Sequence, residues 1–477
     1  MIIVIKNSKC YQIIKLIALN LSFYVSIRTI PTIAKAGLHS IFFIILSGIL
    51  FAIPIALISA ELATTWPEDI GPHIWVKLAL GDKWSFITAW LLWIETFLGF
   101  IMICSGFATL ISYSINLSYL GRNRIYIFTV ILITIWIITI INLRSKVNEK
   151  AMSIAPILGI YLPYIIVISL GIWYAIKFGN INLGPITLKN LLPNLKSFSN
   201  ASYFSAILYT FAGLEIASSH AADLDEPNKK YPKVIFFSIL FLIVFNILGG
   251  LTEANSVPAN DIQLASITQI FALYFNILNI PFATNILAFI IAFSVFIQLR
   301  SWTLRPSKIL LKLADDGDLP YIFKKRSKTN LPITLILIQS IGISLLDFIY
   351  LIVRDVNIGF FSILILATII YCIIYALLVI SHLVLKYKFP NKKGAFSIPG
   401  GKFGIWFTTI LALIGICLTM FFALIPCNII PKNRHLNYLI FEISLTLISF
   451  FTPIILFRRR PFIIKAFKRI CTKIHKK

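Results

Sequence analysis

Three ionisable side chains interrupt otherwise apolar stretches of the sequence. Arg28 lies in SFYVSIRTIPTIAKAG, Glu95 in a long apolar run, and Glu215 in YTFAGLEIASSH. An ionised group at the centre of a bilayer costs roughly 2.5–3.5 kcal/mol on insertion scales, so each should pair or face water. Arg28 could receive a substrate carboxylate while an acid accepts a substrate ammonium or a transported proton. The alternative is a fixed structural ion pair between Arg28 and one acid.

The composition shows what kind of chain carries these residues. Of 477 residues, 58% are apolar and 13% charged, and the mean hydropathy is +0.90, which excludes a water-soluble domain. The formal net charge of +25 does not indicate nucleic-acid binding, because Lys and Arg cluster in short segments between long apolar runs. The six cysteines form no CxxC pair, so we expect neither a metal site nor a cofactor.

The apolar runs predict an all-α polytopic membrane protein. Water is absent from the hydrocarbon core, so each span must satisfy its own backbone, and runs of this length can do so only as helices. About twelve transmembrane helices are expected, near residues 12–36, 40–65, 84–114, 125–143, 152–176, 200–221, 233–252, 281–304, 331–350, 358–385, 403–426 and 436–457.

Two of these spans, the first and the sixth, should be broken. Pro31 removes a backbone donor from the first span, and Gly213 weakens the helix beside Glu215 in the sixth. Breaks that open two five-helix halves predict a 5+5 inverted repeat followed by two further helices. The expected units are residues 1–198 (helices 1–5), 199–385 (helices 6–10), 386–457 (helices 11 and 12) and a basic tail, 458–477.

The two breaks also predict a polar site. Freed amides around Ile30 to Ala34 would attract a carboxylate, and freed carbonyls around Phe211 to Leu214 would accept bonds from an ammonium. Such a site suits a zwitterionic amino acid. The alternative for either break alone is a packing kink, which is less convincing when both fall in corresponding positions.

Several stretches carry a resemblance to a known family. They are SIRTIPTIAKAG at the first break, AELATTWPEDIGPHIWV (60–76), GLEIASSHAADLDEPNKKYP (213–232), SWTLRPSK (301–308), LPITLILIQS (331–340) and FSIPGGK (396–402). With them the chain resembles bacterial amino acid permeases of the amino acid/polyamine/organocation superfamily, specifically the glutamate:GABA antiporter group. The resemblance covers nearly the whole chain.

The resemblance implies a secondary transporter that moves amino acids or related small amines by alternating access. It implies that Glu215 lines the substrate site and that Tyr371 and Tyr375, one turn apart, face it as gates. Glu95 and Glu215 are candidates for a proton or charge relay. Together the breaks and the resemblance predict a substrate site made of Ile27, Arg28, Thr29, Ile30, Pro31, Phe211, Ala212, Gly213, Leu214, Glu215, Tyr371 and Tyr375.

Four positions depart from the family's pattern. Arg28 stands where the glutamate antiporters have an aromatic residue, and Glu95 stands where glutamine is usual. Gln298 replaces an acid before the SW motif, and Arg305 replaces a glycine. Substrate identity, and exchange as against proton coupling, are therefore left open.

Two other function classes fit the sequence less well than a transporter does. A membrane-embedded enzyme would need a reactive pair at one depth, but the six histidines lie near span ends or in loops. A channel would need a selectivity ring or filter, for which the sequence gives no signal. The chain also has no GxxxxGK[ST] motif for nucleotide binding. Expected partners are a small amino acid substrate, the lipid bilayer of a bacterial inner membrane and a second copy in a homodimer, but no nucleic acid.

Charge distribution predicts that both termini are cytoplasmic. Most of the 43 Lys and Arg residues lie in the N-terminal segment, in alternate loops and in the tail from Arg458, all on one side of the membrane if twelve helices are threaded. Reporter fusions to each end should give cytoplasmic activity for both. Activity of either fusion on the far side would contradict the twelve-span topology.

Overall fold

Helices make up almost all regular structure in the part of the chain that the structure describes. The computed structural model describes residues 29–66, 71–144, 157–193, 200–214, 227–317, 319–327 and 330–474. No β-strand forms within these ranges, where the extended pairing is limited to one bridge between Arg326 and Pro332. The prediction of an all-α polytopic membrane protein is confirmed.

The helical elements follow one another along the chain with short connections. Labels beginning with η are 3-10 or π-helical segments. In chain order the elements are α3 (Ile30–Lys35), α4 (His39–Ser47), η2 (Gly48–Ala52), α5 (Ile53–Thr65), α6 (Pro72–Leu80), α7 (Asp82–Ser114), η3 (Ser118–Arg122), α8 (Arg124–Arg144), η4 (Ile157–Tyr161), α10 (Leu162–Phe178), α11 (Leu188–Leu191), α12 (Ser202–Leu208), η6 (Tyr209–Phe211), α14 (Pro227–Ser256), α15 (Thr268–Ile277), α16 (Phe282–Asp315), η8 (Tyr321–Lys324), α17 (Ile333–Asp347), α18 (Ile349–Val353), α19 (Val356–Lys388), α20 (Gly401–Ala423), η9 (Lys432–Arg434) and α21 (His435–Ile474).

Ten helical stretches among the described residues are long and apolar enough to cross a membrane. They correspond to every predicted span except the first, most of which lies outside the described residues, and the sixth, which is interrupted. The predicted division into units 1–198, 199–385, 386–457 and 458–477 stays a prediction.

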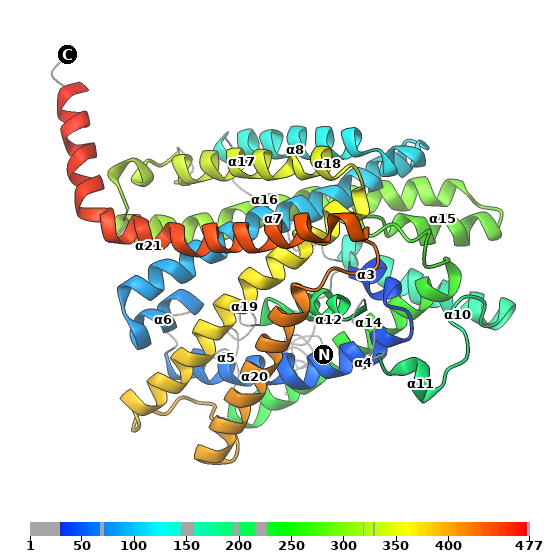
Figure 1. Cartoon of the computed structure of the whole chain (residues 1–477), viewed down its shortest axis with the longest axis horizontal. Coiled ribbons are helices and arrows are strands. Elements are labelled where there is room, and N and C mark those ends of the chain that lie inside the picture. Colours follow the sequence, from blue (N-terminus) through cyan, green and yellow to red (C-terminus); the bar gives the residue numbers. More distant parts are fainter. Residues whose placement is uncertain are drawn as a thin grey trace, which may run out of the picture.

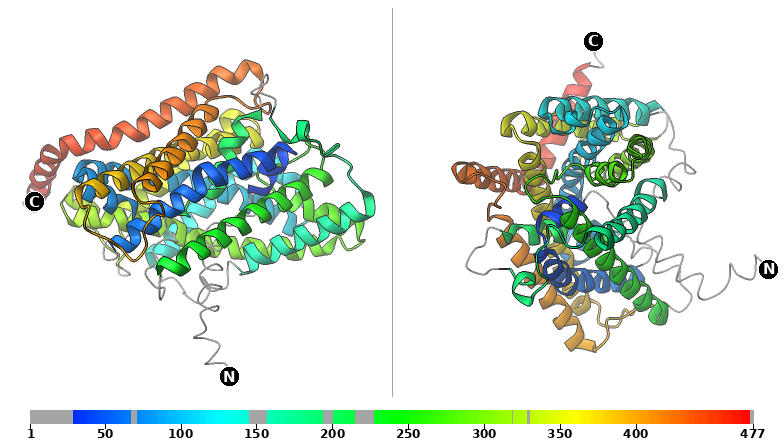
Figure 2. Two further views of the ribbon diagram at one scale, coloured as in Figure 1. Left: turned by 90° about the horizontal axis from the view of Figure 1, so that it is seen from below. Right: turned by 90° about the vertical axis from the view of Figure 1, so that its right-hand side faces the viewer.

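Two long helices form the centre of the bundle. In α7 and α19, 89% and 83% of the membrane-spanning window is buried, against 11% in the window that contains the start of α21. α7 packs against α16, α19 and α8, while α21 runs along the outside and its last part turns away from the bundle (Figures 1 and 2). Residues that must bind a solute away from lipid are therefore expected on α7 and α19.

The sixth span breaks where the sequence predicts. α12 ends at Leu208, a 3-10 turn covers Tyr209–Phe211, and Ala212 has an extended backbone with φ −68° and ψ 143°. Gly213 follows with φ +100°, a conformation that side-chain-bearing residues rarely adopt. Helical geometry resumes at Leu214. The chain thus turns within the bundle and leaves helical backbone groups without their usual partners.

For the first span, the break at Pro31 predicts non-helical backbone from Ser26 to Pro31, and the structure differs from this prediction in detail. Thr29 is in a 3-10 turn, but α3 already begins at Ile30, so Ile30 and Pro31 are helical. The physical reason is that proline is favourable in a first helical turn, where its missing N–H would have no partner in any case. Ser26 and Arg28 lie outside the described residues.

The short helix α3 is held mainly by α14 and also contacts α12. The contact with α14 depends on the absence of side chains at Gly249 and Gly250. A Cβ atom placed on Gly250 would lie 2.2 Å from Ile33 Cγ2, and one on Gly249 would lie 3.0 Å from Ile30 Cδ1. Because α3 contacts α12, the described part of the first span lies beside the first half of the sixth span.

Substituting Gly250→Ala should destabilise the protein by forcing α3 away from α14. Overpacking a close contact costs about 1–3 kcal/mol, so a lower thermal unfolding midpoint in detergent is expected. Ile33→Ala in the same chain should recover part of the loss, because the clashing atom belongs to Ile33. Equal midpoints for wild type and Gly250→Ala would contradict this packing.

Candidate substrate-binding site

The break in the sixth span is held by a tyrosine of α19. The Gly213 backbone N–H donates a 2.7 Å hydrogen bond to the Tyr375 hydroxyl, and only 1% of Tyr375 is exposed. This bond joins residues 162 positions apart in the chain. It supplies the interrupted helix with a partner for an amide that the bilayer could not hydrate.

Aromatic rings surround this contact. Tyr371 stacks on Tyr375 with ring centroids 5.6 Å apart and an interplanar angle of 19°. Phe51 in η2 meets Tyr375 edge to face at 4.9 Å. The two tyrosines therefore share one face of α19, as their spacing predicts, and that face points toward the sixth span.

A buried carboxylate completes the cluster from a third element. The hydroxyl of Tyr209, in the 3-10 turn, donates a 2.9 Å hydrogen bond to Glu95 Oε1 of α7. The Tyr209 ring packs edge to face against Tyr371 at 5.8 Å. Glu95 is 1% exposed and, like Tyr375, lies near the middle of a helix of 33 residues. A side chain in the middle of such a helix lies deep in a membrane.

On the first span, Thr29 and Ile30 are covered by α10 and α14. Tyr164 of α10 hydrogen-bonds with Thr29, and its hydroxyl donates to Asn246 Oδ1 of α14 at 3.4 Å. Pro31 is also buried in the first turn of α3. Thr29 at the start of α3 is thus tied to α10 through Tyr164, which is in turn bonded to Asn246 of α14.

The structure brings some predicted site residues together and leaves others undescribed. Glu95, Gly213, Tyr371 and Tyr375 form one connected cluster. Phe211 and Leu214 are buried, and Ala212 is partly exposed. Ile27, Arg28 and Glu215 lie outside the described residues. Tyr209, which joins Glu95 to Tyr371, was missed in the sequence, although its place four residues before Gly213 could have indicated it.

This arrangement can recognise a small polar molecule but offers no covalent chemistry of its own. A carboxylate, phenolic hydroxyls and interrupted backbone groups can exchange hydrogen bonds with an ammonium or carboxylate group. Among the described residues, no group of three or more His, Cys, Asp or Glu side chains could hold a metal ion.

A second charged cluster, which the sequence reasoning missed, joins α5 to α19. Glu61 Oε2 lies 2.8 Å from His382 Nε2, and Glu61 Oε1 lies 2.5 Å from Lys386 Nζ. Glu61 and His382 are buried, while Lys386 is partly exposed. The acid inside the predicted span 40–65 was the available signal. The cluster ties the C-terminal end of α5 to the C-terminal end of α19.

Three more acids are fully buried within helices. Both carboxyl oxygens of Glu253 in α14, Asp347 in α17 and Glu442 in α21 have no hydrogen-bond partner among the described residues. Asp347 and Glu442 fall inside predicted spans, so the rule that singled out Glu95 and Glu215 applies to them equally.

Known proteins that are similar to this chain over most of its length are membrane transporters. The family model described as "Amino acid permease" matches residues 12–450. An uncharacterized transporter of Legionella pneumophila is 28% identical over 449 residues, which is 94% of this chain and 96% of that protein. The glutamate/gamma-aminobutyrate antiporter of Lactococcus lactis is 29% identical over 469 residues, with 96% and 90% covered. A probable agmatine/putrescine antiporter of the same species is 24% identical over 303 residues, with 62% and 63% covered.

Substituting Tyr375→Phe tests the bond that holds the break. It leaves the buried Gly213 amide without its partner, which costs about 1–3 kcal/mol, so the unfolding midpoint in detergent should fall. Tyr387→Phe is a matched control on the same helix, because Tyr387 is 62% exposed and its hydroxyl only accepts a bond from Trp406 Nε1. Equal shifts for the two variants would contradict a special role for the Tyr375 hydroxyl.

Proposed function

Because the chain belongs to the amino acid permease family and is therefore a secondary transporter, we propose that it exchanges amino acids or related amines at the interrupted first and sixth spans. The family membership also makes it a transporter rather than an enzyme or a channel. The resemblance found in the sequence is thereby confirmed at the level of the family.

The observation that supports this site best is the cluster at the turn in the sixth span. Backbone departs from helix at Ala212 and Gly213, next to a buried carboxylate, Glu95, and two stacked tyrosines of α19. Irregular backbone at membrane depth is tolerated where protein buries it or where it lines a cavity. Substrate binding gives a reason to keep both the irregular backbone and the acid.

In this proposal the two ends of a zwitterion are recognised by different spans. The substrate ammonium is bound by Glu95 or Glu215 together with carbonyl oxygens of the sixth span. The substrate carboxylate is bound by Arg28, with Ile27, Thr29, Ile30 and Pro31 forming the wall around it. Tyr371 and Tyr375 close over the substrate and reopen as the bundle rocks.

The relatives give the chemical range of substrates to test. Their names specify glutamate, gamma-aminobutyrate, agmatine and putrescine, so each carries at least one amine or ammonium group. We propose that this chain takes a substrate from the same chemical range. An acid at position 95 favours a positively charged group on the substrate.

The proposal places the protein in the inner membrane of a bacterium with both termini in the cytoplasm. Bacterial relatives and the charge distribution support this orientation. The complete exchange cycle takes place within one chain, so a homodimer would pair two complete transporters.

Counterflow into proteoliposomes tests the function. Vesicles preloaded with unlabelled L-glutamate, gamma-aminobutyrate, agmatine or putrescine should accumulate the labelled form of at least one of them. Wild-type vesicles that accumulate none of the four would contradict the proposed exchange of this substrate class.

Substitutions at Arg28 and Glu215 test the proposed site. Glu215→Gln keeps the shape but removes the charge, so transport or its pH dependence should change at normal abundance. Arg28→Lys keeps a charge but loses the two-pronged guanidinium, so the affinity for a carboxylate substrate should fall by about tenfold or more, or ~1.4 kcal/mol.

A structural ion pair would give a different pattern. Single charge removals would then lower folded protein, and a double neutral variant at Arg28 and Glu215 would restore both abundance and transport. Restored transport in the double variant would show that the pair does not handle substrate, while leaving the transporter function intact.

A further inference from the structure

Glu253 is a buried acid for which the substrate site described above gives no role. It lies in α14, three residues before the helix ends at Ser256, and its side chain is 0% exposed. Neither carboxyl oxygen has a hydrogen-bond partner among the described residues. An ionised carboxylate without partners is costly to bury, so this position favours an acid that carries a proton.

The acid shares a helix face with the residues that hold α3. Asn246, Gly249, Gly250 and Glu253 are spaced at i, i+3, i+4 and i+7, so they follow one stripe of α14. Gly249 and Gly250 contact Ile30 and Ile33 of α3. A change of charge at Glu253 therefore acts on the same helix face that packs against α3.

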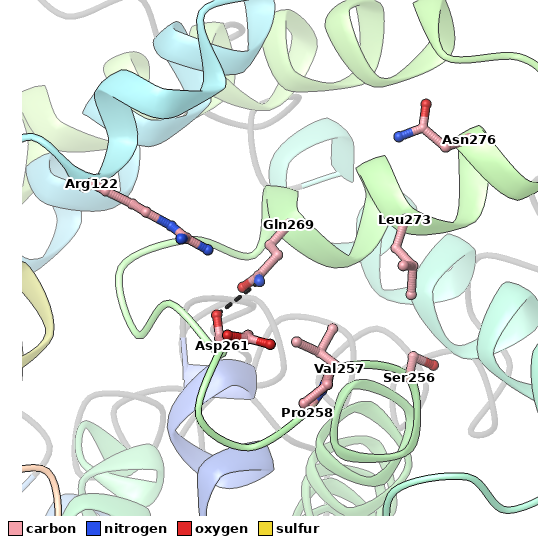
Figure 3. Close-up of a pocket in the computed structure, with 8 residues that line it drawn as sticks. All are labelled: Arg122, Ser256, Val257, Pro258, Asp261, Gln269, Leu273 and Asn276. Atoms are coloured by element: carbon pink, nitrogen blue, oxygen red, sulfur yellow. Dashed lines mark hydrogen bonds between the residues drawn. The ribbon is translucent and has the colours of Figure 1, made fainter.

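A cavity of about 370 Å³ lies just beyond the end of α14 (Figure 3). It is lined by Arg122, Ser256, Val257, Pro258, Asp261, Gln269, Leu273 and Asn276. Arg122, Pro258 and Asp261 are exposed, so this cavity meets solvent on that side. The Gln269 side chain donates a 2.9 Å hydrogen bond to the Asp261 carbonyl and holds the loop across the cavity.

Two hydroxyl groups that are hydrogen-bonded to each other lie where the cavity meets α14, one helical turn beyond the acid. Ser256 lines the cavity, and its Oγ is 2.8 Å from the Tyr274 hydroxyl of α15. The buried Tyr274 hydroxyl also donates to the Thr252 carbonyl at 3.4 Å, and Thr252 directly precedes Glu253 in α14. Hydroxyls that both donate and accept hydrogen bonds can pass a proton from water to a buried group.

We propose that Glu253 is a proton-binding site, loaded from this cavity through Ser256 and Tyr274, and that its protonation is linked to movement of the first span. The proposal rests on the transporter function above and adds a coupling ion to it. In the loading step a hydronium ion in the cavity gives up a proton, one Glu253 oxygen gains an O–H bond, and a water molecule remains. No oxidant, reductant or further reactant is needed.

Other titratable groups on the elements packed near α14 leave this assignment intact. Lys35 donates to the Ala259 carbonyl, and Glu61 is paired with His382 and Lys386. Lys177 lies over the rings of Trp173 and Phe178. Among the described residues, the titratable groups on α3, α4, α5, η4, α10 and α15 are Lys35, His39, Glu61, Tyr161, Tyr164, Tyr174, Lys177 and Tyr274.

The test compares Glu253→Gln with wild type in proteoliposomes that contain a pH-sensitive dye. The labelled probe is L-glutamate, or whichever of gamma-aminobutyrate, agmatine and putrescine the wild type exchanges. Wild type should move protons together with the probe, and its transport should rise as the pH on the cavity side falls. Glu253→Gln should lose proton movement, and its probe counterflow should no longer vary with pH.

Glu442→Gln is the matched control. Glu442 is also fully buried with no hydrogen-bond partner among the described residues, but it lies in α21, which packs against α7 and α19. Its variant should keep proton movement and the wild-type pH profile. Loss of proton movement in both variants to the same degree would overturn the assignment to Glu253.

The outcomes separate this inference from the proposed function. Probe exchange without proton movement in wild type, or an unchanged pH profile in Glu253→Gln, would overturn the proton site and leave the transporter function standing. No transport of any probe by wild type would instead count against the proposed function. If Glu253→Gln does not fold, Tyr274→Phe decides: slower proton uptake supports the pathway, and wild-type proton uptake overturns it.

Discussion

A backbone amide inside a membrane must find a partner within the protein, and the turn in the sixth span is built around this requirement. At Ala212 and Gly213 the helix stops supplying its own hydrogen bonds. The Tyr375 hydroxyl takes the Gly213 amide at 2.7 Å, and stacking with Tyr371 holds that tyrosine in place. Because water cannot satisfy these groups at this depth, the break exists only where α19 approaches it.

The same requirement links binding to motion. A hydrogen bond between the turn and α19 must be kept or exchanged when one helix group rocks against the other. Glu95 of α7 joins this cluster because it accepts a hydrogen bond from Tyr209 in the turn, and the Tyr209 ring packs against Tyr371 of α19. In the proposed site, a substrate would compete for hydrogen bonds that already hold the bundle together, and such competition is one physical route from binding to conformational change.

Close packing gives the first span its own constraint. α3 is only six residues long and could not persist alone, since isolated helices of this length do not form in water. It is held because Gly249 and Gly250 let α14 approach Ile30 and Ile33. The main contact of α3 is with α14, and Glu253 lies one turn along the face of α14 that makes this contact. Proton binding there and substrate binding at the turn would act on the same helix.

The sequence alone determined the membrane class, ten unbroken spans and the position of the break in the sixth span, because apolar run length, Pro and Gly report local backbone preferences. It also determined the family, through motifs spread over the chain. Which groups meet was decided by tertiary structure. The bond from Gly213 to Tyr375 spans 162 residues, and the contact of Glu61 with His382 spans 321. Side-chain partners at such separations depend on how helices pack, and hydropathy along the chain carries no record of that packing.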